Sequence, residues 1–162
     1  LAQKVLVIPA YHSPFKSANQ ASAFHRLKMV HLAFSKDPNI EIDDREIRRQ
    51  GPSFMVETLE ELQQEHPKQE FRLIIGADNV PDFFKWHRAT DILSLCKILV
   101  LGRQGYALNP EEKYKKSFIL TPDFDQRVSS TEIRVILASR QPTGGLLPAS
   151  VAQHIQDHGL YR

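Results

Sequence analysis

The sequence Phe71-Arg72-Leu73-Ile74-Ile75-Gly76-Ala77-Asp78 contains a short, continuous apolar run that leads at once into turn-forming residues. Three other runs of this kind occur in the chain, and turn residues follow each of them as well. Continuous runs of this length are typical of parallel strands that are buried on both faces. A further strand, at residues 40–43, alternates in polarity and is therefore expected nearer an edge. The continuous strands are expected at residues 5–8, 71–75, 97–101 and 118–120.

Segments with helical periodicity lie between these strands and after them. Ser53 is expected to cap the second helix. Ser129-Ser130-Thr131-Glu132 predicts a capping box, because Glu132 stands three residues after Ser129. Pro148 opens the last helix and Gly159 ends it. The helices are expected to cover about residues 24–34, 56–62, 82–94, 129–139 and 148–155.

This alternation of strands and helices predicts an α/β fold, a Rossmann-like open parallel sheet with helices on both faces. The chain has 162 residues, 41% of them hydrophobic, and contains no repeat and no interior linker. That length is sufficient for one sizeable core, so we expect residues 1–162 to form a single domain. Ligands of open sheets bind at the carboxyl ends of the strands, which makes the residues after each strand the candidates for function.

Composition excludes several classes of protein. The single cysteine, Cys96, cannot form an internal disulfide, which favours a reducing, cytoplasmic setting. The net charge of +2 gives no general attraction to nucleic acid. No apolar run approaches the roughly 20 residues of a membrane span. We therefore expect neither a nucleic-acid partner nor a membrane partner. The sequence also lacks Walker-type, Gly-x-Gly-x-x-Gly and Gly-x-Ser-x-Gly motifs.

The seven histidines are scattered and show no paired spacing of metal ligands. His154 and His158 stand four residues apart on the last expected helix and could face the same way. With only one cysteine a structural zinc site is not expected, and we predict no metal ligand.

Three candidate positions follow the expected strands. Lys16 ends the loop after the first strand and could meet a phosphate, although a solvated surface lysine is the simpler interpretation. Gly76 permits close approach of the backbone, and Asp78 could accept hydrogen bonds from ribose hydroxyls or merely cap the next helix. Trp86, the only tryptophan, could stack on a planar heterocycle or belong to the core.

The start of the helix at residues 129–139 could hold a polyphosphate. Ser129, Ser130 and Thr131 bring hydroxyl groups and backbone N–H groups to the positive end of the helix dipole. Arg134 adds a cation one turn later. The alternative is an ordinary capping box with a surface arginine.

Taken in order, these segments resemble the bacterial nicotinate-nucleotide adenylyltransferases of the nucleotidyltransferase superfamily. The Ser-Ser-Thr-x-Ile-Arg element marks only the superfamily, because pantetheine-phosphate adenylyltransferases carry similar forms. The spacing from Gly76-Ala77-Asp78 to Trp86, together with Pro52-Ser53-Phe54, is specific to the nicotinate branch. The matching segments are residues 5–16, Arg26 with Met29 and Ala33, 44–49, 52–54, 58–59, 75–78, Trp86, Arg103 with 105–106, 129–134, 146–148 and 159–162.

The resemblance implies that the phosphate of nicotinate mononucleotide attacks the α-phosphorus of ATP, with Mg²⁺ accompanying ATP and no protein nucleophile. The products would be deamido-NAD and pyrophosphate. By resemblance, Lys16 and Arg134 are the expected catalytic residues. The expected ligands of ATP are Gly76, Asp78, Arg103, Ser129, Ser130, Thr131 and Arg134, and those of nicotinate mononucleotide are Met55, Trp86 and His87.

Two of these positions depart from the family pattern. The family usually has threonine where Met55 stands and often has tyrosine where His87 stands. In the family, backbone amides at these positions read the nicotinate carboxylate. Backbone donors survive both changes, so a preference for the acid over the amide is weakened but still expected.

Members of the family begin with a strand and a Gly-Gly-Ser/Thr-Phe-Asp-Pro-x-His-x-Gly-His loop, whose histidines stabilise the transferred phosphate. This sequence starts after that loop, in effect at the second strand, and we expect it to be an N-terminally truncated form of an active enzyme. The alternatives are a transferase for another phosphorylated acceptor and a non-catalytic nucleotide-binding remnant. A homo-oligomer is left open.

Overall fold

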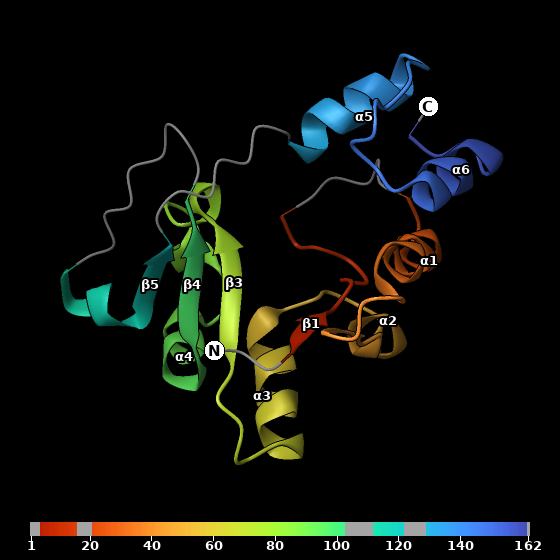
Figure 1. The fold of residues 1–162 in the computed structure, drawn as a ribbon. Helices are drawn as coiled ribbons and strands as arrows, with labels where there is room; N and C mark the ends of the chain where they lie inside the picture. The colour runs from red at the N-terminus through yellow and green to blue at the C-terminus, as the bar shows by residue number, and fades with distance from the viewer. Residues whose placement is uncertain (1–3, 16–20, 103–111, 122–128, 162) are drawn as a thin grey trace. The chain divides into compact units, whose positions relative to one another are not determined.

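The protein is an α/β chain in the computed structural model, and every described strand pair is parallel (Figure 1). This confirms the fold class expected from the sequence. Each expected strand is present, with ends that shift by at most one residue. The structure describes residues 4–15, 21–102, 112–121 and 129–161.

The strands form two sheets, one in each of two compact units. The first unit contains Leu1–Ser53 with Val128–Arg162, and the second contains Phe54–Arg127. The sequence predicted one continuous sheet, but no backbone pairing joins the two sheets within the described ranges. A sheet is continuous only where neighbouring strands exchange backbone hydrogen bonds. The sheets are β1 (Val5–Val7) with β2 (Ile40–Ile42), and β3 (Arg72–Gly76), β4 (Lys97–Leu101) and β5 (Phe118–Thr121) in that order.

The described residues of the first unit form four helices, three of which the sequence predicted. Ser22 caps the first, since its Oγ accepts a hydrogen bond from His25 N at 3.3 Å. The first and last of these helices pack together, and Ser150 Oγ donates a hydrogen bond to Leu32 O at 3.2 Å. The helices are α1 (Ala23–Phe34), α2 (Arg45–Arg49), α5 (Ser130–Ala138) and α6 (Ala149–Asp157). The unexpected α2, with five residues, is too short for helical periodicity to reveal it.

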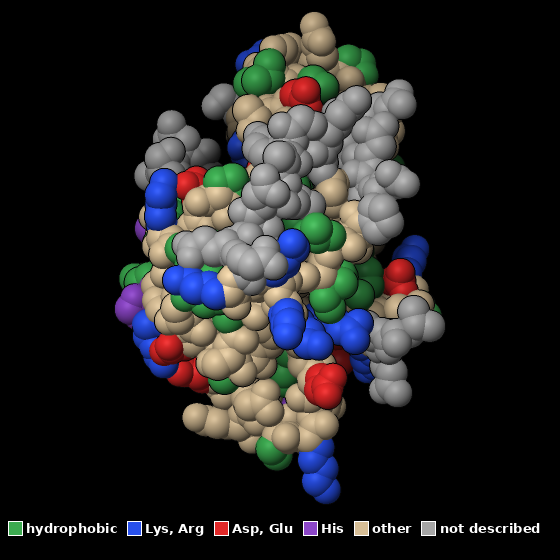
Figure 2. Space-filling view, turned by 90° about the vertical axis from the view of Figure 1, so that its left-hand side faces the viewer, with side chains coloured by type: hydrophobic (Ala, Val, Ile, Leu, Met, Phe, Trp, Pro, Cys, Tyr) green, Lys and Arg blue, Asp and Glu red, His purple; other side chains and the backbone are tan. Residues whose placement is uncertain are grey.

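The core of the second unit is formed by its sheet, α3 (Met55–Glu65) and α4 (Ala89–Leu95). Ile98 and Val100 of the central strand β4 are fully buried. On the opposite face of the sheet, Ile74 of β3 is 45% exposed. On the face of the molecule shown in Figure 2, other hydrophobic side chains lie at the surface among charged ones.

The prediction of a helix over about residues 82–94 is wrong for the first half of that range. Phe83–Lys85 form a single 3₁₀ turn, Trp86 is extended (φ −70°, ψ 149°), and α4 begins only after Arg88. Arg88 has a left-handed backbone (φ 52°, ψ 44°), which a right-handed helix cannot contain. The Phe83 ring is fully buried, so packing into the core overrides the helical periodicity of this segment.

The prediction that Ser53 caps the second helix is also wrong. The residue that precedes α3 is Phe54, which makes no side-chain capping hydrogen bond. Ser53 Oγ instead accepts a hydrogen bond from Tyr11 N at 2.9 Å, and Ser53 N donates to His12 O at 2.8 Å. The bond from Tyr11, in the loop after β1, uses the hydroxyl that the sequence assigned to the helix.

Ile98→Ala is expected to lower the free energy of unfolding by about 2–5 kcal/mol, because the substitution leaves a cavity at a fully buried position. Ile74→Ala in the neighbouring strand is the matched control. Ile74→Ala should lower the free energy of unfolding by about 1 kcal/mol, which is the range that strand propensities span. Urea unfolding followed by circular dichroism measures both variants. Equal losses would contradict the assignment of the core to this face of the sheet.

Candidate functional site

Three strands of the second unit end side by side. The register pairs Gly76 with Leu101 and Leu101 with Thr121, so the carboxyl ends of β3, β4 and β5 are level. This edge of a parallel sheet is the usual place for a ligand. The turn Gly76-Ala77-Asp78 therefore lies where the sequence analysis expected a functional site.

Gly76 is not required at this turn by its backbone angles, but a side chain at this position would displace that of Asp78. Its φ of −74° and ψ of 153° are open to any residue. A Cβ at this position would instead collide with Asp78 Oδ1. Asp78 lies within the 3₁₀ turn Ala77–Asn79 and does not cap it, and its Oδ1 accepts a hydrogen bond from Asn79 Nδ2 at 3.3 Å. The exposed carboxylate thus folds back over the strand end.

The position of Trp86 is compatible with both interpretations made from the sequence, a core residue and a ring that stacks on a ligand. Its ring centroid lies 5.4 Å from that of the buried Phe83, with the planes tilted by 42°. The core therefore holds one side of the indole. The residue as a whole is only partly buried, which leaves some of its surface accessible to solvent.

His87 packs against the start of α3. Its ring centroid is 4.4 Å from that of Phe54, and the planes are inclined by 37°. Phe54 immediately precedes Met55, the first residue of α3. This contact brings together the two segments whose backbone amides were expected to serve one carboxylate. Sequence reasoning had not given Phe54 this linking role, and its only signal was its place after Pro52-Ser53.

Arg88 makes two ion pairs that the sequence did not reveal. Its Nη2 donates to Glu60 Oε1 at 2.6 Å and its Nε donates to Asp91 Oδ2 at 2.7 Å. These hydrogen bonds, first that to Glu60, raise the pKa of Arg88. They tie the left-handed residue after His87 to both α3 and α4. No local pattern could have paired Arg88 with a residue 28 positions away.

The capping box predicted at Ser129 is confirmed. Ser129 Oγ accepts a hydrogen bond from Glu132 N at 3.1 Å, and Glu132 Oε2 accepts one from Ser129 N at 2.6 Å. Arg134 Nη2 donates to Ser130 Oγ at 3.3 Å, so the guanidinium lies over the first turn of α5. Thr131 is exposed beside it. The helix start combines an ordinary capping box with a cation held over exposed hydroxyls, and the two interpretations do not exclude each other.

Arg26 shapes the loop after β1. Its Nη2 donates to Tyr11 O at 2.7 Å, its Nε donates to Ala21 O at 3.1 Å, and its Nη1 donates to Ala10 O. These bonds hold the backbone on both sides of the segment that contains Lys16. Arg26 is one of the residues matched to the family, and these hydrogen bonds give it a structural role in the loop.

The predicted site residues fall into three groups. Gly76, Asp78, Met55, Trp86 and His87 belong to the second unit, whose strand ends and α3 position them. The phosphate-binding candidates Ser129, Ser130, Thr131 and Arg134 belong to the first unit. Lys16 and Arg103 lie outside the described residues.

Cys96 is not a candidate nucleophile. It is buried, and burial raises the pKa of its thiol to about 11. The thiolate is the reactive form of cysteine, so the sulfur is inert at neutral pH.

Ser129→Ala is expected to lower the free energy of unfolding by about 1 kcal/mol, because it removes one half of the capping box. Thr131→Ala, two residues away and outside the box, is the matched control and should change stability by less than about 0.5 kcal/mol. Thermal unfolding of the two variants measures the difference. An equal effect of both would show that the box contributes nothing to stability.

Comparison with known proteins gives the context of this geometry. A family model described as cytidylyltransferase-like matches residues 1–136. A probable nicotinate-nucleotide adenylyltransferase of Bacillus pumilus is 37% identical over 159 residues, which cover 98% of this chain and 82% of the relative. The nicotinate-nucleotide adenylyltransferase of Bacillus subtilis is 31% identical over 159 residues, with 98% and 82% covered.

A solved structure shares the fold. The nicotinic acid mononucleotide adenylyltransferase of Plasmodium falciparum, complexed with NaAD, superposes with a TM-score of 0.79 at 18% sequence identity, over 98% of this chain and 82% of that one. The sequence relatives extend over nearly the whole chain. The chain therefore belongs to the nicotinate-nucleotide adenylyltransferase family of the cytidylyltransferase-like nucleotidyltransferases.

Proposed function

We propose that the chain transfers AMP from ATP to nicotinate mononucleotide, which gives deamido-NAD and pyrophosphate. The similarity to nicotinate-nucleotide adenylyltransferases over 98% of the chain carries this proposal. An oxygen of the acceptor phosphate attacks the α-phosphorus directly, so the protein has to align two anions and spread the charge that develops. Residues 1–162 would act as one nucleotidyltransferase domain, since the family model runs across both units.

We assign the ATP phosphates to the start of α5. Backbone N–H groups in the first turn of a helix lack acceptors within the helix and favour an anion. The exposed Ser130 and Thr131 add hydroxyl donors, and Arg134 is already held over this turn by its bond to Ser130. Lys16 and Arg103 would add further positive charge. Lys16 and Arg134 are the proposed catalytic cations, because both would stabilise charge on the phosphates.

We assign the nucleotide and the pyridine ring to the second unit. Gly76 and Asp78 would contact the nucleotide at the end of β3. The amides of Met55 and His87, brought into one region by the Phe54–His87 ring contact, would bind the nicotinate carboxylate. Trp86 would stack on the pyridine with the part of its ring that the core leaves accessible.

Mg²⁺ enters this proposal as part of the ATP substrate. In such sites Mg²⁺ is held by substrate phosphates with one or two carboxylates and keeps several waters. Glu132 Oε2 already accepts a hydrogen bond from Ser129 N. At the start of α5 the ion would therefore be coordinated mainly by the phosphates. We place the reaction in the cytoplasm because the sequence has a single cysteine. Among the described helices, none combines the length and the hydropathy needed to cross a membrane.

Trp86→Ala is expected to weaken the binding of nicotinate mononucleotide roughly 5- to 150-fold, since stacking on an aromatic side chain contributes about 1–3 kcal/mol. Isothermal titration calorimetry measures the change. Phe84→Ala is the matched control, because Phe84 is an exposed aromatic residue in the 3₁₀ turn that precedes Trp86. If both variants bind the nucleotide as tightly as the parent, the stacking role is wrong and another phosphorylated acceptor becomes the better substrate.

Gly76→Ala is expected to lower kcat/KM for ATP about tenfold or more, because misplacing a binding group by about 1 Å can cost about 100-fold. The new Cβ would displace the carboxylate of Asp78. A double-mutant cycle with Asp78→Ala tests this cause. If Gly76 acts through Asp78, the double variant is no worse than Asp78→Ala alone. Losses that add fully in the double variant would contradict the mechanism.

A further inference from the structure

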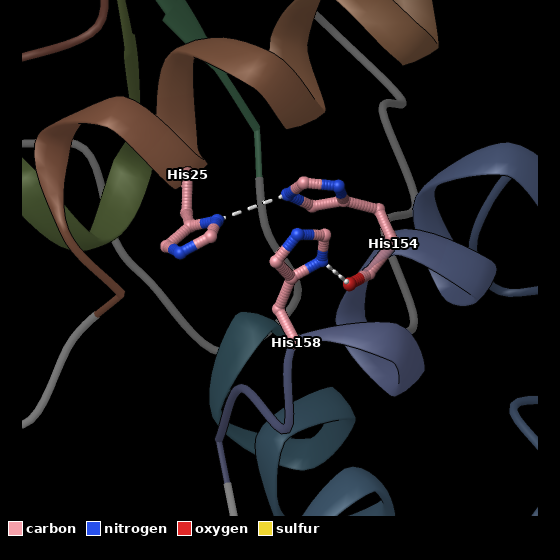
Figure 3. Close-up of side chains that lie close together, drawn as sticks. All are labelled: His25, His154 and His158. Atoms are coloured by element: carbon pink, nitrogen blue, oxygen red, sulfur yellow. Dashed lines mark hydrogen bonds between the residues drawn. The ribbon is translucent and has the colours of Figure 1, made fainter.

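Three histidines from two helices converge in the first unit (Figure 3). His25 lies in the first turn of α1, while His154 lies in α6 and His158 directly follows that helix. Each ring offers one nitrogen as a ligand atom, and these three nitrogens all lie within 4.8 Å of one another. The nearest pair is His25 Nδ1 and His154 Nε2, which share a hydrogen bond at 3.1 Å (Figure 3). The proposed adenylyl transfer uses none of these side chains.

The ring of His158 is oriented for ligation. Its Nδ1 lies 2.9 Å from the carbonyl oxygen of His154. A carbonyl only accepts, so Nδ1 must carry the hydrogen and the neutral ring keeps its lone pair on Nε2. Figure 3 shows Nε2 turned toward the rings of His25 and His154. A backbone carbonyl that holds the far nitrogen of an imidazole is the usual outer partner of a metal-binding histidine.

One of the separations between the nitrogens is already close to that of a tetrahedral site. Zinc–nitrogen bonds of about 2.0–2.1 Å place neighbouring ligand nitrogens about 3.3 Å apart. The His25–His154 separation of 3.1 Å is near this value. His158 is exposed, so its side chain has room to close the remaining distance. His154 is buried.

We propose that His25, His154 and His158 bind one divalent ion of the zinc class. Imidazole suits zinc and the other late transition ions, and three histidines with an open fourth position for water form a known type of zinc site. The ion would join α1 to α6, two helices that are far apart in the sequence and pack together in the fold. Its role would be to stabilise the first unit.

The site escaped the sequence analysis for a plain reason. The pair His154 and His158 has a ligand-like spacing of four, but the third ligand lies 129 residues before His154. The zinc motifs that can be recognised from a sequence have much shorter spacings. The expectation that the chain has no metal ligand is therefore replaced by this proposal.

Zinc binding by the full-length protein, produced without a polyhistidine tag and stripped with a chelator, tests the proposal. Isothermal titration with Zn²⁺ alone is expected to show one ion per chain. His158→Ala should weaken binding at least about tenfold, the lower end of what removal of an outer partner already costs. His31→Ala removes an exposed histidine from the same α1 and is the matched control, which should bind as the parent does.

Two further measurements make the result decisive. Co²⁺ in place of Zn²⁺ should give the visible absorption bands of a tetrahedral ion in the parent and lose them in His158→Ala. The melting temperature should rise with Zn²⁺ in the parent and in His31→Ala only. His154 is buried and could be needed for folding, so His25→Ala serves as the second test variant. If His158→Ala and His25→Ala bind Zn²⁺ as tightly as His31→Ala, the proposal is overturned, whatever the adenylyltransferase activity.

Discussion

The pairing of β4 with a strand on each side is the constraint on which the second unit depends. Ile98 and Val100 are fully buried, so β4 is held by its side chains as well as by its backbone. A slip of one residue in the register would turn every buried side chain to the other face. The same register keeps Gly76 level with Leu101. The position of the turn that carries Asp78 is therefore set by burial within the sheet.

Contacts with the core also explain how an irregular segment can position functional groups. The segment from Phe83 to Arg88 has only one short turn of regular structure. The buried Phe83 ring holds Trp86, and the bonds of Arg88 to Glu60 and Asp91 fix the backbone next to His87. Side-chain contacts thus replace the helical hydrogen bonds that the periodicity had led us to expect. The result leaves part of Trp86 accessible while its other side is anchored.

In the first unit, helices from the two ends of the sequence depend on each other. α1 and α6 are joined by the hydrogen bond from Ser150 to Leu32 and by the cluster of three histidines. Within the cluster, His25 Nδ1 and His154 Nε2 share a hydrogen bond, and the proposed ion would add a further link between the two helices. The chemistry assigned to α5 is separate from it, since that helix contributes no ligand to the cluster.

The sequence by itself determined the features that depend on near neighbours. Continuous apolar runs located the strands, including both ends of β4, and the spacing of Ser129 and Glu132 located the start of α5. Ordered motifs also indicated the family and most of the candidate site. Only the tertiary structure decided the broken helix around Trp86, the loss of Ser53 as a cap, and the meeting of His25 with His154. Each of these depends on contacts between residues far apart in the chain, which periodicity and local spacing do not record.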